Sequence, residues 1–125
     1  MSKKVITIPD APKLPFSPAI KAGDYIFVSG QTGHQDRKTG EEIKGIEAQT
    51  RQCLEKMKRV LKAADSALSD VVKMTVFLRN ANDFVKMNEV YQGYFVEDQP
   101  ARSTVVTNLV MPNMLIEVEC IAYHP

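Results

Sequence analysis

Residues 114–123 read MLIEVECIAY, and their alternation decides the fold. In a β-strand, successive side chains point to opposite faces of the sheet. One face of this strand would carry only apolar groups and would pack against helices. The other face would mix two acids with three large apolar groups: Leu115, Glu117, Glu119, Ile121 and Tyr123. A face in water needs no such apolar groups, so this pattern is typical of a subunit interface that contains a polar site.

Other stretches of the chain also have the composition of strands. Residues 25–29 are aromatic and β-branched, and we expect this strand to end at Gly30. Residues 71–79 are apolar on both faces, which is typical of a strand with neighbours on both sides. Residues 101–109 precede a Pro-Asn turn signal, and residues 5–8 can form a short edge strand.

Two helices are predicted from apolar residues that recur at three- and four-residue steps. The clearer one runs from Gly45 to about Asp65, with Gln49 among the polar residues that cover its solvent side. The second spans residues 83–97. The resulting order predicts an α+β fold, in which two helices pack on one face of a mixed β-sheet. The other face of the sheet needs a partner, so we expect an oligomer.

The bulk composition indicates a single soluble domain over residues 1–125. Hydrophobic residues make up 44% of the chain and charged residues 25%, as in an ordinary globular protein. The net charge is +1 and both signs are interspersed, whereas nucleic-acid binders usually carry a concentrated basic surface. No apolar run approaches the ~18 residues that span a bilayer, and no signal-peptide core is present. We therefore expect a cytoplasmic protein without a membrane partner.

The cysteines and histidines predict neither a disulfide nor a metal site. Cys53 falls on the apolar side of the first predicted helix and Cys120 on the apolar face of the last strand, so both are expected to be buried free thiols. His34 and His124 are the only histidines, and no matched acid accompanies them in sequence. The cysteines also lack a local partner for nucleophilic catalysis.

Arg102 and Glu117 are the strongest candidates for a functional pair. They lie on the last two predicted strands, which can come close in one sheet and frame a small pocket. A guanidinium holds a carboxylate through two parallel hydrogen bonds, and a carboxylate can orient a water molecule. This combination suits hydrolysis of a small, charged carbon–nitrogen compound. An ordinary cross-strand ion pair is the alternative interpretation.

Several segments, in the same order along essentially the whole chain, resemble the RidA family, also called the YjgF/YER057c/UK114 family. They are VSGQ at 28–31, the strand and Asn-Asp-Phe of 75–84, Asn88 followed by Tyr91, PARS at 100–103, and IEVECIA at 116–122. The resemblance implies a chorismate-mutase-like fold and a homotrimer with ligand sites in clefts between subunits. It also implies hydrolysis of reactive enamines and imines, notably 2-aminoacrylate and 2-iminopropanoate, to 2-oxo acids and ammonia. The family uses no metal and no cofactor.

The same resemblance assigns roles to individual residues. Arg102 falls on the essential arginine of the family and Glu117 on its water-binding glutamate. Substrate-binding positions, by the same comparison, are Phe16, Ser29, Gly30, Asn88, Ser103 and Thr104. Two of these depart from the family pattern, which often has a tyrosine at Phe16 and a cysteine at Thr104. The missing phenol hydroxyl at Phe16 leaves the substrate open.

Several other functions remain as alternatives at this point. The substrate can be a different enamine, such as the aminoacrylate of pyrimidine breakdown or a 2-aminomuconate-type compound. Relatives have also been described as endoribonucleases or translation inhibitors, although the near-neutral charge speaks against that class. A non-catalytic, holdase-like protein is the third alternative, and it would not depend on Arg102 or Glu117.

Overall fold

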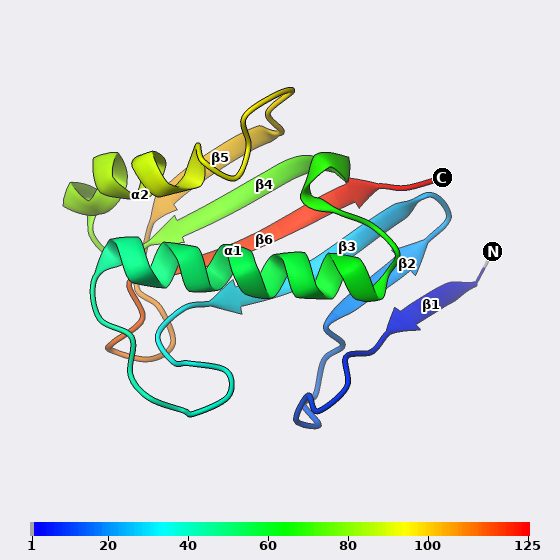
Figure 1. The fold of residues 1–125 in the computed structure, drawn as a ribbon, viewed down its shortest axis with the longest axis horizontal. Coiled ribbons are helices and arrows are strands. Elements are labelled where there is room, and N and C mark those ends of the chain that lie inside the picture. The colour runs from blue at the N-terminus through cyan, green and yellow to red at the C-terminus, as the bar shows by residue number, and fades with distance from the viewer. Residues whose placement is uncertain (1) are drawn as a thin grey trace.

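A six-stranded mixed sheet forms one layer of the protein, and two helices lie across the same face of it (Figure 1). The computed structural model describes residues 2–125. The strands are β1 (Lys3–Ile6), β2 (Ala19–Ala22), β3 (Tyr25–Thr32), β4 (Val71–Leu78), β5 (Ala101–Val106) and β6 (Ile116–Tyr123). Their order in the sheet is β1-β2-β3-β6-β4-β5, and only β4 and β5 pair in parallel. The predicted α+β architecture is therefore confirmed.

The helices are α1 (Ile46–Ala63) and α2 (Phe84–Tyr91), with short 3-10 turns η1 (Leu68–Asp70) and η2 (Ala81–Asp83) before β4 and α2. Helix α1 packs on β3 and β6 and also contacts α2. The second helix is shorter than predicted. The amides of Gly93 and Tyr94 bond three residues back, to Val90 and Tyr91, which tightens the chain into turns after the helix. Phe95, which lies beyond the end of this helix, is still buried in the core.

Five strands differ from the prediction, and only β4 agrees with it to within one residue. Strand β1 lies two residues earlier than the predicted 5–8. Strand β2 was missed, because it is held between β1 and β3 by pairing that its four residues do not encode. Strand β3 continues past Gly30 to Thr32, since an irregularity between Val28 and Gln31 lets the ladder resume. Strand β6 is two residues shorter at its start than predicted, and β5 ends three residues earlier than predicted. The remaining residues between β5 and β6 form a loop.

The alternation predicted for β6 is confirmed. Its helix-side residues are each at most 4% exposed: Ile116, Val118, Cys120 and Ala122. Cys53 of α1 is buried in the same core, and both cysteines are free thiols, as expected. No helix of the described chain lies over the opposite sheet face, which we call the open face. Large apolar groups there remain nearly half exposed: Tyr25, Phe27, Val105 and Tyr123.

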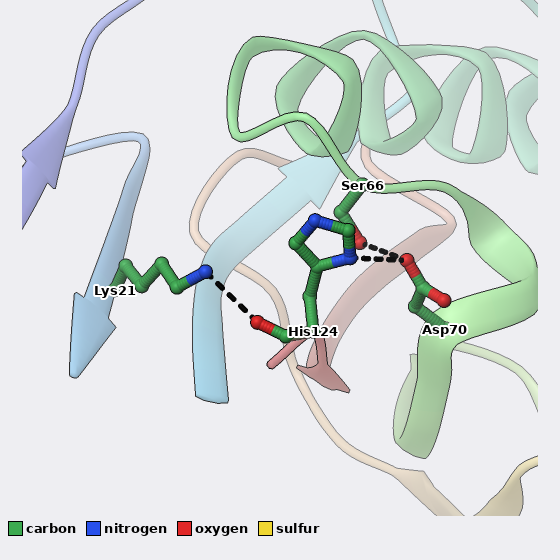
Figure 2. A network of polar contacts seen from close by, with 4 residues as sticks. All are labelled: Lys21, Ser66, Asp70 and His124. Atoms are coloured by element: carbon green, nitrogen blue, oxygen red, sulfur yellow. Dashed lines mark hydrogen bonds and ion pairs between the residues drawn. The ribbon is translucent and has the colours of Figure 1, made fainter. Parts of the chain in front are cut away.

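A hydrogen-bonded network anchors the C-terminal end of the chain (Figure 2). The Nδ1 atom of His124 lies 3.1 Å from Oδ2 of Asp70, and the Ser66 hydroxyl donates to the same oxygen over 2.7 Å. The Lys21 ammonium donates to the His124 carbonyl over 2.8 Å. The hydrogen bond from Ser66 holds the pKa of the Asp70 carboxyl below its usual range. Since Ser66 is bound to the carboxylate and not to the imidazole, the three residues form an anchor and not a nucleophile with its base.

Gln49 corrects the sequence analysis, because it is 2% exposed instead of facing solvent. Its amide nitrogen donates to the carbonyls of Ile43 and Asn113, both over 2.9 Å, and its amide oxygen accepts from the amide of Leu115 over 2.9 Å. Arg79 holds the same loop through hydrogen bonds to three of its carbonyls, those of Leu109, Met111 and Met114. These two residues fix the segment that leads into β6, and hence the position of Glu117.

None of the helices within residues 2–125 has the length and apolar character needed to cross a membrane.

Replacing Gln49 by leucine should lower the free energy of unfolding by about 3 kcal/mol, because two carbonyls and one amide would be buried without partners. Gln52→Leu on the same helix is the matched control. It removes a single exposed hydrogen bond of 3.3 Å to Gln35 and should change stability by less than about 0.5 kcal/mol. Urea unfolding followed by circular dichroism measures both, and equal effects would contradict the anchoring role of Gln49.

Candidate active site

Arg102 points to the helix side of the sheet. It pairs with Met74 on β4, which in turn pairs with Cys120 on β6, and both of these lie in the core. The guanidinium carbon lies 4.7 Å from the ring centre of Tyr91 and 5.8 Å from that of Phe84. Both rings come from α2, and a guanidinium over an aromatic face is held by a cation–π interaction. The rings therefore fix the direction of Arg102 while leaving its donor groups available to a ligand.

Two hydroxyls beside Arg102 are buried without a hydrogen-bond partner within the described part of the chain. They are the phenol of Tyr91 and Oγ1 of Thr104, which lies two residues from Arg102 on the same face of β5. Burial raises the pKa of the Tyr91 phenol, so this group stays protonated and can donate. Buried polar groups are nearly always satisfied in native proteins. A ligand or a second chain would complete these two.

Asn88 lies on α2, one turn from both rings that flank Arg102, as its spacing predicted. We call Arg102, Thr104, Asn88 and Tyr91 the arginine half-site.

Ser103 is not part of the arginine half-site, because strand alternation turns its side chain to the open face. There it accepts a hydrogen bond from Lys73 over 3.0 Å. Its expected place in a common pocket with Arg102 is therefore not found within one chain.

Glu117 lies on the open face, where it pairs with Thr32 on β3 and Phe77 on β4. Its carboxylate sits against Gly30, so closely that a Cβ at Gly30 would overlap its Oε2 atom. Burial raises the pKa of Glu117, the nearby Glu119 raises it further, and the positive charge of Lys56 lowers it. Because a side chain at position 30 would overlap the Glu117 carboxylate, Gly30 is required for the carboxylate to lie where it does.

The irregularity in β3 also organises the residues next to Glu117. Ser29 donates its hydroxyl to the Ser17 carbonyl over 2.6 Å, and its amide bonds to the Pro18 carbonyl. These bonds hold the proline-rich segment beside β3. Phe16 and Gly30 line a cavity of about 850 Å³ together with the end of β3 and one side of α1. We call Phe16, Ser29, Gly30 and Glu117 the glutamate half-site.

A single chain does not bring the two half-sites together, in contrast to the expected pocket. Arg102 is in register with Met74 of β4, whereas Glu117 is in register with Phe77. Positions an odd number of residues apart on a strand face opposite sides, so the two side chains point away from each other. They are also separated by the width of β4. The alternative of an ordinary ion pair is likewise wrong for one chain.

Sequence reasoning missed Tyr91 and Lys56 as neighbours of the candidate residues. Tyr91 has the helical spacing of a core residue, and it packs in the core while its ring lies against the Arg102 guanidinium. Lys56 was counted with the solvent-side residues of the first helix. It nevertheless comes three residues after Cys53 and four before Val60, both buried, so it borders the apolar stripe. That spacing is the signal that could have identified it.

Among residues 2–125, no group of three or more histidine, cysteine, aspartate or glutamate side chains is placed to hold a metal ion.

Comparison with known proteins gives one consistent answer. The sequence profile of the family described as "Endoribonuclease L-PSP" matches residues 8–124. A "RutC family protein" from Pyrococcus horikoshii is 52% identical over 97% of this chain and 98% of its own length. A "2-iminobutanoate/2-iminopropanoate deaminase" from Dermatophagoides farinae is 38% identical, covering 95% and 94%. The "3-aminoacrylate deaminase RutC" of Acinetobacter baylyi is 37% identical, covering 96% and 98%.

Solved structures agree with these relatives. The YjgF gene product from E. coli superimposes with a TM-score of 0.87 at 36% identity, covering 96% of this chain and 98% of that one. The profile match and the relatives extend over nearly all of the sequence, and they show that this chain belongs to the YjgF/RidA family.

Proposed function

We propose that this protein hydrolyses reactive 2-enamino and 2-imino acids, of the 2-aminoacrylate and 2-iminopropanoate type, to 2-oxo acids and ammonia. The reaction takes place in clefts between the subunits of a homotrimer. The observation that carries the proposal is the opposite orientation of Arg102 and Glu117 within one chain. The deaminase names of two relatives support the reaction class.

Assembly resolves the separation of the two half-sites. The open face carries half-exposed aromatic and aliphatic groups, which favour contact with another subunit. A contact that joins two different surfaces of identical chains closes into a ring when the rotation allows it. In a ring of three, the arginine half-site of each subunit meets the glutamate half-site of the next. This arrangement is the trimer of the chorismate-mutase-like fold that the family resemblance implies.

Arg102 binds the carboxylate of the substrate in this mechanism. Its planar guanidinium offers two parallel donors, which fix the plane of the imino acid as well as neutralising its charge. The hydroxyls of Tyr91 and Thr104 are buried donors beside it and gain partners when the substrate carboxylate is bound. Asn88 borders the same space.

Glu117 orients the attacking water. The carboxylate accepts a proton from water as the water oxygen bonds to C2 of the protonated imine, and the C=N double bond becomes a single bond to a neutral amine. The proton then passes from Glu117 to the amine nitrogen, the C–N bond breaks to release ammonia, and the hydroxyl proton passes to Glu117 and on to solvent as C=O forms. One imino acid and one water give one 2-oxo acid and one ammonia. Holding water and substrate in line supplies much of the acceleration.

Phe16 shapes the wall of the cleft without providing a hydrogen-bonding group. It is 56% exposed in one chain and lines the cavity that contains Gly30. A wall without a hydroxyl also suits the 3-aminoacrylate of pyrimidine breakdown or a larger, 2-aminomuconate-type enamine, and these are the alternative substrates.

Cleavage of RNA is the alternative from another class, because the matched family carries the description of an endoribonuclease. The net charge of +1 disfavours it, since binding to a phosphate backbone depends on clustered positive charge.

Arg102→Lys should lower kcat/KM by at least about tenfold without unfolding the protein, because an ammonium cannot form the two parallel bonds. The assay generates 2-aminoacrylate in situ with a PLP-dependent dehydratase and follows 2-oxo acid release. Arg51→Lys, an exposed exchange on α1, is the matched control and should leave the rate unchanged. Near-normal turnover by Arg102→Lys would exclude the clamp and favour a holdase-like protein.

Mixing two inactive variants tests whether the site lies between subunits. Arg102→Ala and Glu117→Gln are each expected to be inactive. When equal amounts are refolded together, about one quarter of the sites should combine an intact Arg102 with an intact Glu117 from the neighbouring subunit. Activity should therefore return to about that fraction of the wild-type value. No recovery from mixed oligomers of verified composition would place the site within one subunit.

Filter binding of single-stranded RNA at physiological salt should show no retention above that of a neutral control protein. Tight retention, or cleavage that depends on Glu117, would favour the endoribonuclease instead.

A further inference from the structure

Lys56 is a half-buried cation on α1 with little compensation of its charge. Its ammonium donates one hydrogen bond, to the Thr32 carbonyl over 2.9 Å, at the end of β3. No carboxylate of the described chain lies within ion-pair distance of it. Burial lowers the pKa of Lys56, whereas the charge of Glu117 raises it. A cation in this state stabilises a nearby anion that is itself partly buried.

The backbone brings Lys56 and Glu117 to the same end of β3. Thr32, which accepts the hydrogen bond from Lys56, is the direct ladder partner of Glu117. The Glu117 carboxylate lies against Gly30, two residues earlier. Gly30, Thr32 and Lys56 all line the same cavity. The missing side chain at Gly30 leaves room for the Glu117 carboxylate beside the end of β3 to which Lys56 is bonded.

The other charged and titratable groups near Glu117 do not replace Lys56. Glu119 on the same strand has the same sign and raises the pKa of Glu117, as burial does. Cys53 on α1 is a neutral, buried thiol whose pKa burial raises to about 12. His34, which lines the same cavity, has its pKa lowered by burial and by the charge of Lys56. Lys56 is the cation of the same chain that favours the ionised form of Glu117.

We propose that Lys56 is a positioning residue for Glu117, fixing the end of β3 against it and holding it as a carboxylate that can accept a proton from water. The proposal rests on the deaminase function above. Arg102 of a neighbouring subunit would face the substrate carboxylate, which leaves Lys56 as the cation dedicated to Glu117. A role in packing alone would need the hydrogen bond to Thr32 but not the charge.

The positive charge of Lys56 determines in which direction its removal shifts the pH dependence of activity. Removing the ammonium favours protonation of Glu117, and a protonated Glu117 cannot act as the base. Activity should therefore be lost on the acidic side of the pH profile, while at higher pH the carboxylate forms again and activity returns.

Three variants separate charge from packing. Lys56→Gln keeps a donor for Thr32 but removes the charge, Lys56→Arg keeps the charge, and Lys58→Gln is an exposed control on the same helix. In the assembled protein, Lys56→Gln should lower kcat/KM by about threefold or more near pH 5, with recovery toward the wild-type value near pH 8. Lys56→Arg and Lys58→Gln should follow the wild-type profile. A uniform loss at every pH would overturn the proposal.

A second measurement does not depend on activity. The carboxyl carbon of Glu117 can be titrated by ¹³C NMR in glutamate-labelled protein, with its signal assigned from its absence in Glu117→Gln. The midpoint should move to higher pH in Lys56→Gln and stay in place in Lys56→Arg. If Lys56→Gln does not fold, Lys56→Met replaces it. An unmoved midpoint in the folded neutral variant overturns the role of Lys56, whereas a moved midpoint in a protein without deaminase activity refutes the proposed function alone.

Discussion

The alternation of side chains along β6 is the constraint on which the rest of the structure depends. This strand lies between β3 and β4 and buries every second residue under the helices. A slip of one residue would bury Glu117 and Glu119 and expose Ile116 and Val118, which the core does not tolerate. The same packing that forms the core therefore holds the carboxylates on the open face. Gln49 and Arg79 fix the loop before the strand and so set where the alternation begins.

A second consequence of register is the division of the candidate site. The parallel pairing of β4 and β5, connected through α2, turns Arg102 toward the helix layer and places the rings of Phe84 and Tyr91 over it. The antiparallel pairing of β6 turns Glu117 the other way. An enzyme built from this chain would need a neighbour to unite the two groups, which would couple its activity to its assembly. Two buried hydroxyls without partners mark the side of the chain that such a union would complete.

Opposing effects act on the ionisation of Glu117 in the glutamate half-site. A partly buried carboxylate next to a second acid favours protonation, and a base must be ionised. Gly30 leaves room for Glu117, and the Lys56 ammonium of α1, bonded to the carbonyl of Thr32 at the end of β3, supplies the opposite charge. Gly30 also lines the cavity that Phe16 lines, so the shape of this cavity and the position of the Glu117 carboxylate depend on one short segment of β3.

Local patterns in the sequence by themselves determined the α+β class, both helices, the core face of β6 and the two free thiols, whereas most of the candidate site residues came from the family resemblance. Those structural features follow from periodicity and alternation, which act between near neighbours. Tertiary structure alone decided the rest. Strand β2 exists because two other strands pair with it, Gln49 is buried by a loop distant in sequence, and Lys56 reaches Thr32 across the layer between helix and sheet. The opposite directions of the Arg102 and Glu117 side chains depend on the register of β4, β5 and β6. That register is set by long-range pairing, which no single segment encodes.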